Sequence, residues 1–131
     1  MASTPEELTA LMPFAGLTGI ELLSATPEEV RGRLDWSADR CTTGGMLHGG
    51  ALLTLADSLG GVCAYLNLRE GQSTATLESK TNFIRALREG HVEGTARPLH
   101  TGRTTIVVET RLVDAKGRLV SLTLQTQAVI G

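Results

Sequence analysis

The residue of this 131-residue chain best suited to catalysis is a single acid, Asp57, inside a long apolar segment. The segment runs from Gly49 to Leu68, and Asp57 is its only charged residue. An ionised carboxylate in such surroundings is costly unless it is hydrogen-bonded or faces a wet cavity, and isolated acids of this kind are common at catalytic sites. Asp57 is therefore a candidate general base or nucleophile, with a structural acid bonded to a neighbouring strand as the competing interpretation.

The residues that open the segment, His48-Gly49-Gly50, offer a second chemical group. The first turn of a helix carries N–H groups without intrahelical partners and a partial positive charge, which suits a developing oxyanion. Glycine at these two positions lets a substrate carbonyl approach the backbone closely, although the glycines could also simply relieve packing. His48 either caps the helix or contacts a substrate.

A single helix cannot bring both groups to the same carbonyl carbon. Asp57 lies eight residues after Gly49, which is about 12 Å along the axis at ~1.5 Å per residue. Two helices related by a twofold axis can do so, with Gly49 of one chain facing Asp57 of the other. We therefore expect a symmetric dimer with two composite sites. Small residues expected to line the contact are Gly60, Gly61 and Ala64.

Hydrophobic periodicity predicts the elements that position these groups. A short helix is expected over about 4–12, with Thr4 as its cap, Pro5 in its first turn and Pro13 as its stop. Strands are expected over 19–25, 30–36, 73–84, 91–99, 104–113 and 119–130. The stripe of the long helix expected to lie on the sheet is Leu52, Leu55, Leu59, Val62 and Leu66.

The element order predicts an α+β fold in one domain, residues 1–131. Consecutive strands with short connections pair antiparallel, and a sheet that is apolar on one face needs a cover, which only the long helix is large enough to supply. In the fifth strand, one face carries Ile106, Val108, Thr110 and Leu112. In the last strand, the apolar face is assigned to Val120, Leu122, Leu124, Thr126, Ala128 and Ile130.

Composition argues against several classes of protein. Twelve basic and fourteen acidic residues give a net charge of −2, without the basic excess of nucleic-acid binders. Cys41 and Cys63 are isolated and suggest neither a disulfide framework nor a zinc site. Residues 49–68 approach the length of a membrane span, but their four glycines and one Asp favour a buried helix. Because the N-terminus also lacks a signal-peptide pattern, we expect a soluble, cytoplasmic protein outside the membrane.

Residues 42–57 read Thr-Thr-Gly-Gly-Met-Leu-His-Gly-Gly-Ala-Leu-Leu-Thr-Leu-Ala-Asp. This segment resembles the hotdog-fold acyl-CoA thioesterases, specifically the PaaI-like group of the phenylacetate pathway. That group carries roughly Asn-x-x-Gly-x-x-His-Gly-Gly, followed six residues later by Ala-Asp on a central helix. The element order agrees over about 15–130, and residues 74–85 and 100–104 are similar to a strand and a glycine-arginine turn of the group. The resemblance implies a long helix wrapped by a curved antiparallel sheet. It also implies hydrolysis of a coenzyme A thioester without a metal, coenzyme A being part of the substrate.

The resemblance also implies roles by position. Gly49 would donate its backbone N–H to the thioester carbonyl, with His48 beside it, and Asp57 would be general base or nucleophile. Thr76 would hold the attacking water or steady Asp57, unless it is an ordinary strand residue. Thr42 stands where the group has Asn, and its hydroxyl has a shorter reach and lacks the second group of an amide.

The remaining expectations concern the substrate and the assembly. Gly102, Arg103, Thr104 and Arg88 are candidates for binding the coenzyme A moiety, although Arg103 could equally be only solvated. The four aromatic residues do not select between an aryl and an aliphatic acyl group. The family resemblance implies an aryl or phenylacetyl-type thioester, and a medium-chain acyl group is the alternative. The family resemblance implies a homodimer or a dimer of dimers.

Two other functions compete with thioester hydrolysis. Hotdog hydratases usually pair an acid with a His five residues later, but Gly44 follows Asp39 and Val62 follows Asp57 at that spacing. A non-catalytic acyl-CoA-binding module, as in ligand-sensing regulators of this fold, would carry a DNA-binding segment, and about fourteen residues before the fold cannot supply one. The presence of Asp57 also favours chemistry over binding alone.

Overall fold

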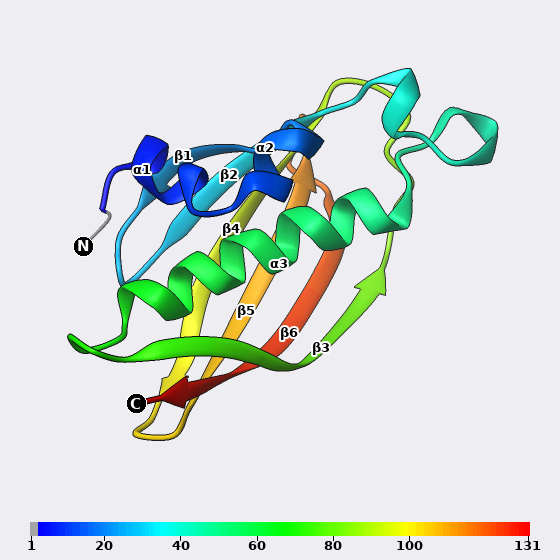
Figure 1. Cartoon of the computed structure of the whole chain (residues 1–131). Helices are drawn as coiled ribbons and strands as arrows, with labels where there is room; N and C mark the ends of the chain where they lie inside the picture. The colour runs from blue at the N-terminus through cyan, green and yellow to red at the C-terminus, as the bar shows by residue number, and fades with distance from the viewer. Residues whose placement is uncertain (1–2) are drawn as a thin grey trace.

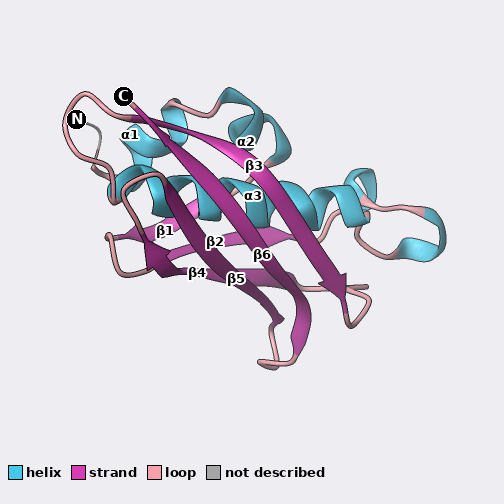
Figure 2. Ribbon diagram, turned by 90° about the horizontal axis from the view of Figure 1, so that it is seen from below, coloured by secondary structure: helices cyan, strands magenta, loops and turns pink. Residues whose placement is uncertain are grey.

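A long helix, α3 (Gly49–Leu66), crosses a curved antiparallel sheet of six strands (Figure 1). The computed structural model describes residues 3–131. The strands pair in the order β1-β2-β4-β5-β6-β3 and curve around one side of the helix (Figure 2). The strands are β1 (Glu21–Ala25), β2 (Val30–Asp35), β3 (Ser73–Phe83), β4 (His91–Thr101), β5 (Thr105–Asp114) and β6 (Leu119–Ile130). The predicted α+β fold, with a helix wrapped by an antiparallel sheet, is thus confirmed.

The helix is held on the sheet by one leucine inserted between two glycines. Gly32 of β2 and Gly94 of β4 are register partners. A Cβ atom at Gly32 would lie 2.5 Å from Leu59 Cδ2, and one at Gly94 would lie 2.6 Å from Leu59 Cδ1. Leu59 is fully buried in the space that the two missing side chains leave. This contact fixes the position of α3 along and around its own axis.

The predicted stripe of α3 faces the sheet. Leu52, Leu55, Leu59 and Val62 are buried, and Leu66 is half-buried. The helix α3 is long and apolar enough to cross a membrane, but the core helix of a globular domain meets the same criteria of length and composition. In this structure the stripe packs on the strands.

The N-terminal segment differs from the prediction. The first helix, α1, covers only Pro5–Ala10, with the Thr4 hydroxyl accepting from the Glu7 N–H at 3.2 Å. Pro13 does not merely end it but opens a second helix, α2 (Pro13–Thr18), which the sequence analysis missed. A proline fits the first helical turn because its missing N–H has no intrahelical acceptor there.

The last strand, β6, presents the opposite face to α3 from the one predicted. Val120 is buried, but Leu124 is 45% exposed and Ile130 is 49% exposed. The β5–β6 register shifts because Leu112 pairs with Ser121 and Val113 with Leu119, which leaves Val120 as the extra residue of a bulge. A one-residue shift exchanges the two faces of a strand. The inner face beyond the bulge is consequently polar, with Ser121, Thr123, Gln125 and Gln127 all buried.

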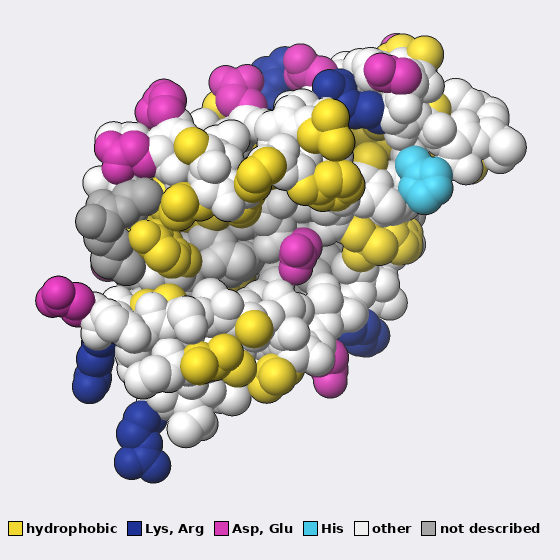
Figure 3. Space-filling view, viewed as in Figure 1, with side chains coloured by type: hydrophobic (Ala, Val, Ile, Leu, Met, Phe, Trp, Pro, Cys, Tyr) yellow, Lys and Arg dark blue, Asp and Glu magenta, His cyan; other side chains and the backbone are white. Residues whose placement is uncertain are grey.

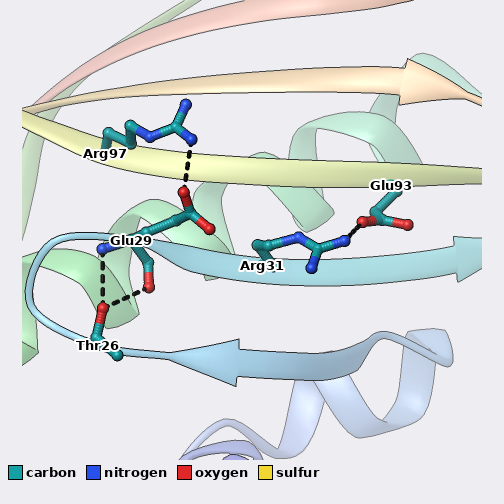
Figure 4. Close-up of polar contacts among 5 residues, drawn as sticks. All are labelled: Thr26, Glu29, Arg31, Glu93 and Arg97. Carbon is teal, nitrogen blue, oxygen red and sulfur yellow. Dashed lines mark hydrogen bonds and ion pairs between the residues drawn. The ribbon is translucent and has the colours of Figure 1, made fainter. Parts of the chain in front are cut away.

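Ion pairs on the outer surface join β2 to β4 (Figure 4). Arg31 pairs with Glu93, and Arg97 pairs with Glu29 at 2.5 Å. Glu29 also closes the turn before β2, where its N–H donates to the Thr26 hydroxyl at 3.2 Å. Partly exposed pairs of this kind contribute only about 0.2–1 kcal/mol each, so they support the pairing of the strands and do not determine it.

The β5–β6 turn is held by one carboxylate. Asp114 Oδ1 accepts from the backbone N–H groups of Lys116 and Arg118, both at 2.9 Å, and Oδ2 accepts from Arg118 Nε at 2.8 Å. The side chain of Asp114 is only 8% exposed. These hydrogen bonds hold the pKa of Asp114 below its usual 3.8, and the bond from the Arg118 N–H has the largest effect.

We predict that Asp114→Asn lowers the free energy of unfolding at neutral pH. Because the pKa is depressed in the folded state, the stabilisation by the ionised Asp114 is present above the usual value of 3.8 and is lost as the pH falls through the lower folded-state value. Urea unfolding of both proteins across the acid range measures this directly. The stability difference should be constant near neutral pH and shrink in acid, and a difference that stays constant in acid would contradict the assignment.

Candidate active site

The first turn of α3 leaves one backbone donor free. His48 caps the helix in an extended conformation (φ −60°, ψ 135°), and its Nδ1 accepts from the Gly50 N–H at 2.7 Å. The Ala51 N–H donates to the His48 carbonyl at 2.9 Å. The Gly49 N–H has no hydrogen-bond partner among residues 3–131. His48 therefore has the capping role, and Gly49 is the donor left for a ligand.

Gly49 opens into a pocket of about 320 Å³ at the end of β3. The ring of Phe83 lies against it, since a Cβ atom on Gly49 would be 3.3 Å from Phe83 Cζ. Thr42 lines the same pocket, and its backbone N–H is bonded to the Met46 carbonyl at 2.9 Å. We call Thr42 and Gly49 the N-terminal half-site.

Asp57 lines a different pocket, of about 440 Å³, together with Thr76. Asp57 lies on the exposed side of α3, away from the buried stripe. Its Oδ1 accepts from Gln125 Nε2 at 3.3 Å, and Thr76 Oγ1 accepts from Gln127 Nε2 at 2.7 Å. We call Asp57 and Thr76 the central half-site. The sequence does not reveal the two glutamines as site residues. The bulge that turns them inward is not visible in the alternation of polar and apolar residues along β6.

The small residues expected at a dimer contact divide into two groups. Gly61 has no atom within 4 Å of the position that a Cβ would occupy, so it remains open to a partner. Gly60 and Ala64 are instead buried within their own chain, which corrects the prediction. Gly60 lies against the Gln125 side chain, so its small size serves packing inside the subunit.

Apolar side chains border the central half-site. Phe14 and Leu53 line the pocket of Asp57 and are 61% and 40% exposed, and Leu17 lines an adjoining pocket and is 81% exposed. Figure 3 shows hydrophobic side chains gathered over α2 and beside α3 on this face of the molecule. A neighbouring pocket of about 580 Å³ shares Phe14 and Thr54 with that of Asp57, so the two adjoin along α3. Exposed apolar surface around a few polar groups is typical of a binding site for a partly apolar ligand.

The candidate coenzyme A residues do not all gather in one place. Gly102 and Arg103 line a polar pocket of about 320 Å³ that also includes Arg69, which the sequence analysis missed. Thr104 is exposed beside it. Arg88 precedes the other end of β4, where its Nη1 donates to the Gly44 carbonyl at 2.8 Å. The eleven residues of β4 span roughly 35 Å at about 3.3 Å each, so Arg88 and Arg103 of one chain cannot bind the same phosphate.

Neither thiol lines the pocket of Asp57. Burial raises the pKa of the Cys63 thiol to about 12, so it is protonated at neutral pH. Cys41 is half-buried and donates to the Ser37 carbonyl at 3.3 Å. Within residues 3–131, no three His, Cys, Asp or Glu side chains gather as a metal site would require.

One chain thus holds an exposed carboxylate beside a strand hydroxyl, and a free helix N–H in a separate pocket. This site on a helix wrapped by a curved antiparallel sheet is the arrangement of the hotdog fold. The family model of the thioesterase superfamily matches residues 44–121, more than half of the chain. The protein therefore belongs to the thioesterase superfamily.

Two relatives are similar to about two thirds of the chain. The 1,4-dihydroxy-2-naphthoyl-CoA hydrolase of Escherichia coli is 41% identical over 86 residues, which are 66% of this chain and 63% of that protein. The proofreading thioesterase EntH of Cronobacter sakazakii is 37% identical over 87 residues, 66% of this chain and 64% of that protein. The match therefore spans less than two thirds of the length of either relative.

Solved structures agree over nearly the whole chain. A mutant of thioesterase PA1618 from Pseudomonas aeruginosa is 32% identical, covers 99% of this chain and 96% of its own, and has a TM-score of 0.92. Thioesterase HI1161 from Haemophilus influenzae is 26% identical, covers 100% of this chain and 93% of its own, and has a TM-score of 0.93. The agreement includes the N-terminal helices as well as the sheet.

Proposed function

We propose that the protein hydrolyses acyl-CoA thioesters to a free acid and coenzyme A, in active sites shared between two chains. The observation that carries the proposal is the separation of the two half-sites on one rigid helix. Gly49 and Asp57 line different pockets of the chain, and each half-site lacks what the other supplies. The superfamily and the coenzyme A thioester named for the Escherichia coli relative support this substrate class.

The chemistry assigns one step to each group. The Gly49 N–H binds the thioester oxygen and stabilises the oxyanion that forms when the carbonyl is attacked, a donor typically worth about 3 kcal/mol of barrier. Asp57 takes the proton of an attacking water whose oxygen adds to the carbonyl carbon, or attacks that carbon itself. Thr76 positions the water or the carboxylate. The carbon–sulfur bond then breaks, and the leaving thiolate recovers the proton that was taken from water. If Asp57 attacks the carbon itself, the product is an anhydride, which water then hydrolyses to the free acid and the carboxylate of Asp57.

The free edge of β3 is the surface where the second chain binds. Within residues 3–131, β3 pairs only with β6, so its other edge is unpaired along eleven residues, and nearly all its side chains are exposed. A long unpaired edge is a template for another strand. Two β3 strands that pair antiparallel place the start of one beside the end of the other. Thr76, near the start, then lies near the partner's Phe83, which contacts Gly49 in its own chain.

The charges on β3 fit such a twofold pairing. Glu78 and Lys80 are exposed on one face of the strand, and neither forms an ion pair within the described part of the chain. An antiparallel register centred on Ser79 puts Glu78 of each strand opposite Lys80 of the other, and the twofold axis makes this pair twice. Opposite charges directly across a strand pair are stabilising.

Other parts of the substrate have matching surfaces. The guanidinium groups of Arg69 and Arg103 suit the phosphates of coenzyme A. The apolar side chains of Phe14, Leu17 and Leu53 suit the acyl group, whether it is aryl or medium-chain. Coenzyme A enters as part of the substrate and the reaction needs no further cofactor. A cytoplasmic enzyme of this kind would meet acyl-CoA directly.

Asp57→Asn should keep the fold and lower turnover of acyl-CoA by about 10³-fold or more, because an amide is neither base nor nucleophile. Thiol release from a panel of aryl, phenylacetyl and medium-chain acyl-CoA measures the effect and identifies the acyl group. A variant within tenfold of the wild type would rule out Asp57 as the catalytic group. Tight binding of acyl-CoA by a wild type that releases no thiol would favour the non-catalytic binding module.

Two inactive variants should restore activity when their chains are mixed. Gly49→Pro removes the oxyanion donor at a position where proline is tolerated, since His48 before it is already extended. In a mixed dimer of Gly49→Pro with Asp57→Asn, one site carries both defects and the other carries neither. Random pairing should therefore restore about a quarter of wild-type activity. Mixed dimers detected by native mass spectrometry without any activity would contradict the shared site.

The β3 pairing is tested by exchanging its charges. Glu78→Lys places like charges opposite each other twice per dimer and should raise the dimer dissociation constant about tenfold or more at low salt. The double variant Glu78→Lys with Lys80→Glu restores both attractive pairs and should return the constant towards the wild-type value. Sedimentation equilibrium measures all three proteins. If the double variant dissociates as readily as the single one, the register is wrong.

A further inference from the structure

Two buried glutamines lie directly beneath the central half-site. Gln125 and Gln127 are each 1% exposed and lie two residues apart on β6, so both point to its inner side. Gln125 Nε2 donates to Asp57 Oδ1, and Gln127 Nε2 donates to Thr76 Oγ1. The same strand therefore supplies one amide donor to each residue of the half-site.

We propose that Gln125 and Gln127 are positioning residues that hold Asp57 and Thr76 in their reactive orientations. The inference rests on the proposed function, because it gives these residues a role only if Asp57 and Thr76 act on a thioester. Neither glutamine lines the pocket of Asp57, so both act through their neighbours and do not touch the substrate.

A glycine on α3 provides the space that Gln125 needs. A Cβ atom on Gly60 would lie 1.7 Å from Gln125 Oε1 and 2.5 Å from its Cδ, so any other residue would displace the amide. Glycine inside a helix is less favourable than alanine. Its presence three residues after Asp57 is explained by the room that it leaves for this side chain.

The Gln125 amide is not explained by stability. Its Oε1 is buried without a hydrogen-bond partner among residues 3–131. A buried acceptor left unpaired destabilises a fold, and an apolar side chain of the same shape would avoid that cost. With Nε2 directed at Asp57 the amide presents a donor to the carboxylate, whereas the reversed amide would oppose two acceptors. The hydrogen bond to Asp57 is therefore the reason for a glutamine at position 125.

Gln127 determines what the Thr76 hydroxyl can do. Because Gln127 Nε2 donates to Thr76 Oγ1 at 2.7 Å, the hydroxyl proton of Thr76 remains free to be donated into the pocket that it shares with Asp57. The Thr74 hydroxyl shares its proton between Gln127 Oε1, at 3.2 Å, and the Ala128 carbonyl, at 2.8 Å. This contact favours the amide orientation in which Nε2 faces Thr76.

The test replaces Gln125 with methionine, an unbranched apolar side chain of similar length. Gln125→Met should lower kcat by about 10- to 100-fold with little change in KM, because a loosened carboxylate affects the reaction more than binding. Its melting temperature should equal or exceed that of the wild type, since the unpaired Oε1 is gone. Thr123→Val, a buried polar-to-apolar change on the same face of β6, is the matched control and should keep kcat.

A double-mutant cycle separates positioning from a purely structural role. If Gln125 acts through Asp57, then Gln125→Met should cause no further loss in the residual activity of Asp57→Asn. The same holds for Gln127→Met in a Thr76→Val background. Additive losses in either pair would overturn the proposal for that glutamine.

Gly60→Ala provides a second route to the same result. It leaves Gln125 in place but displaces its amide, so kcat should fall as in Gln125→Met, which keeps the proposal testable if one variant does not fold. A kcat for Gln125→Met equal to that of Thr123→Val would overturn this inference alone, provided Asp57→Asn is inactive. An active Asp57→Asn would overturn the catalytic role of Asp57, and a wild type that releases no thiol from any acyl-CoA would overturn the proposed function itself.

Discussion

The position of every group in the candidate site depends on how α3 packs on the sheet. Leu59 occupies the space between Gly32 and Gly94, and side chains at either glycine would force the helix away from the strands. Because Leu59 is fixed, Asp57 is directed to the opposite side of the helix, and Gly60 is brought over the buried side chain of Gln125. A packing contact between apolar atoms thus determines where the polar chemistry takes place.

The same helix provides two different kinds of polar group. Its first turn provides a backbone donor, whose direction is set by the helix itself, and its middle provides a carboxylate, whose direction needs help from a neighbouring strand. The rigidity of α3 keeps these groups about 12 Å apart in one chain. The helix of one chain therefore cannot complete a site alone. The unpaired edge of β3 is the surface through which a second chain would supply the missing group. In this arrangement the assembly is part of the chemistry.

Much of this could be predicted from the sequence, because long periodic segments specify their own structure. The central helix, its buried stripe, the six strands and the exposed position of Asp57 all follow from spacing. The orientation of β6 does not, because the bulge at Val120 depends on pairing with β5 and leaves no local signal. Pro13 suits a helix start as well as a helix stop, so the sequence does not reveal α2. Spacing also cannot show whether a small residue such as Gly60 makes room for another chain or for its own.

The polar row on the inner face of β6 matters for anyone who alters this protein. Ser121, Thr123, Gln125 and Gln127 are buried under an apolar helix, where methods that optimise heat resistance favour aliphatic residues. The fold of a protein altered in that way would look unchanged. Its loss of activity would then be attributed to the surface residues of the pocket, although these residues had not been changed. Libraries built on this scaffold should therefore hold Gln125 and Gln127 constant and vary the apolar side chains around α2.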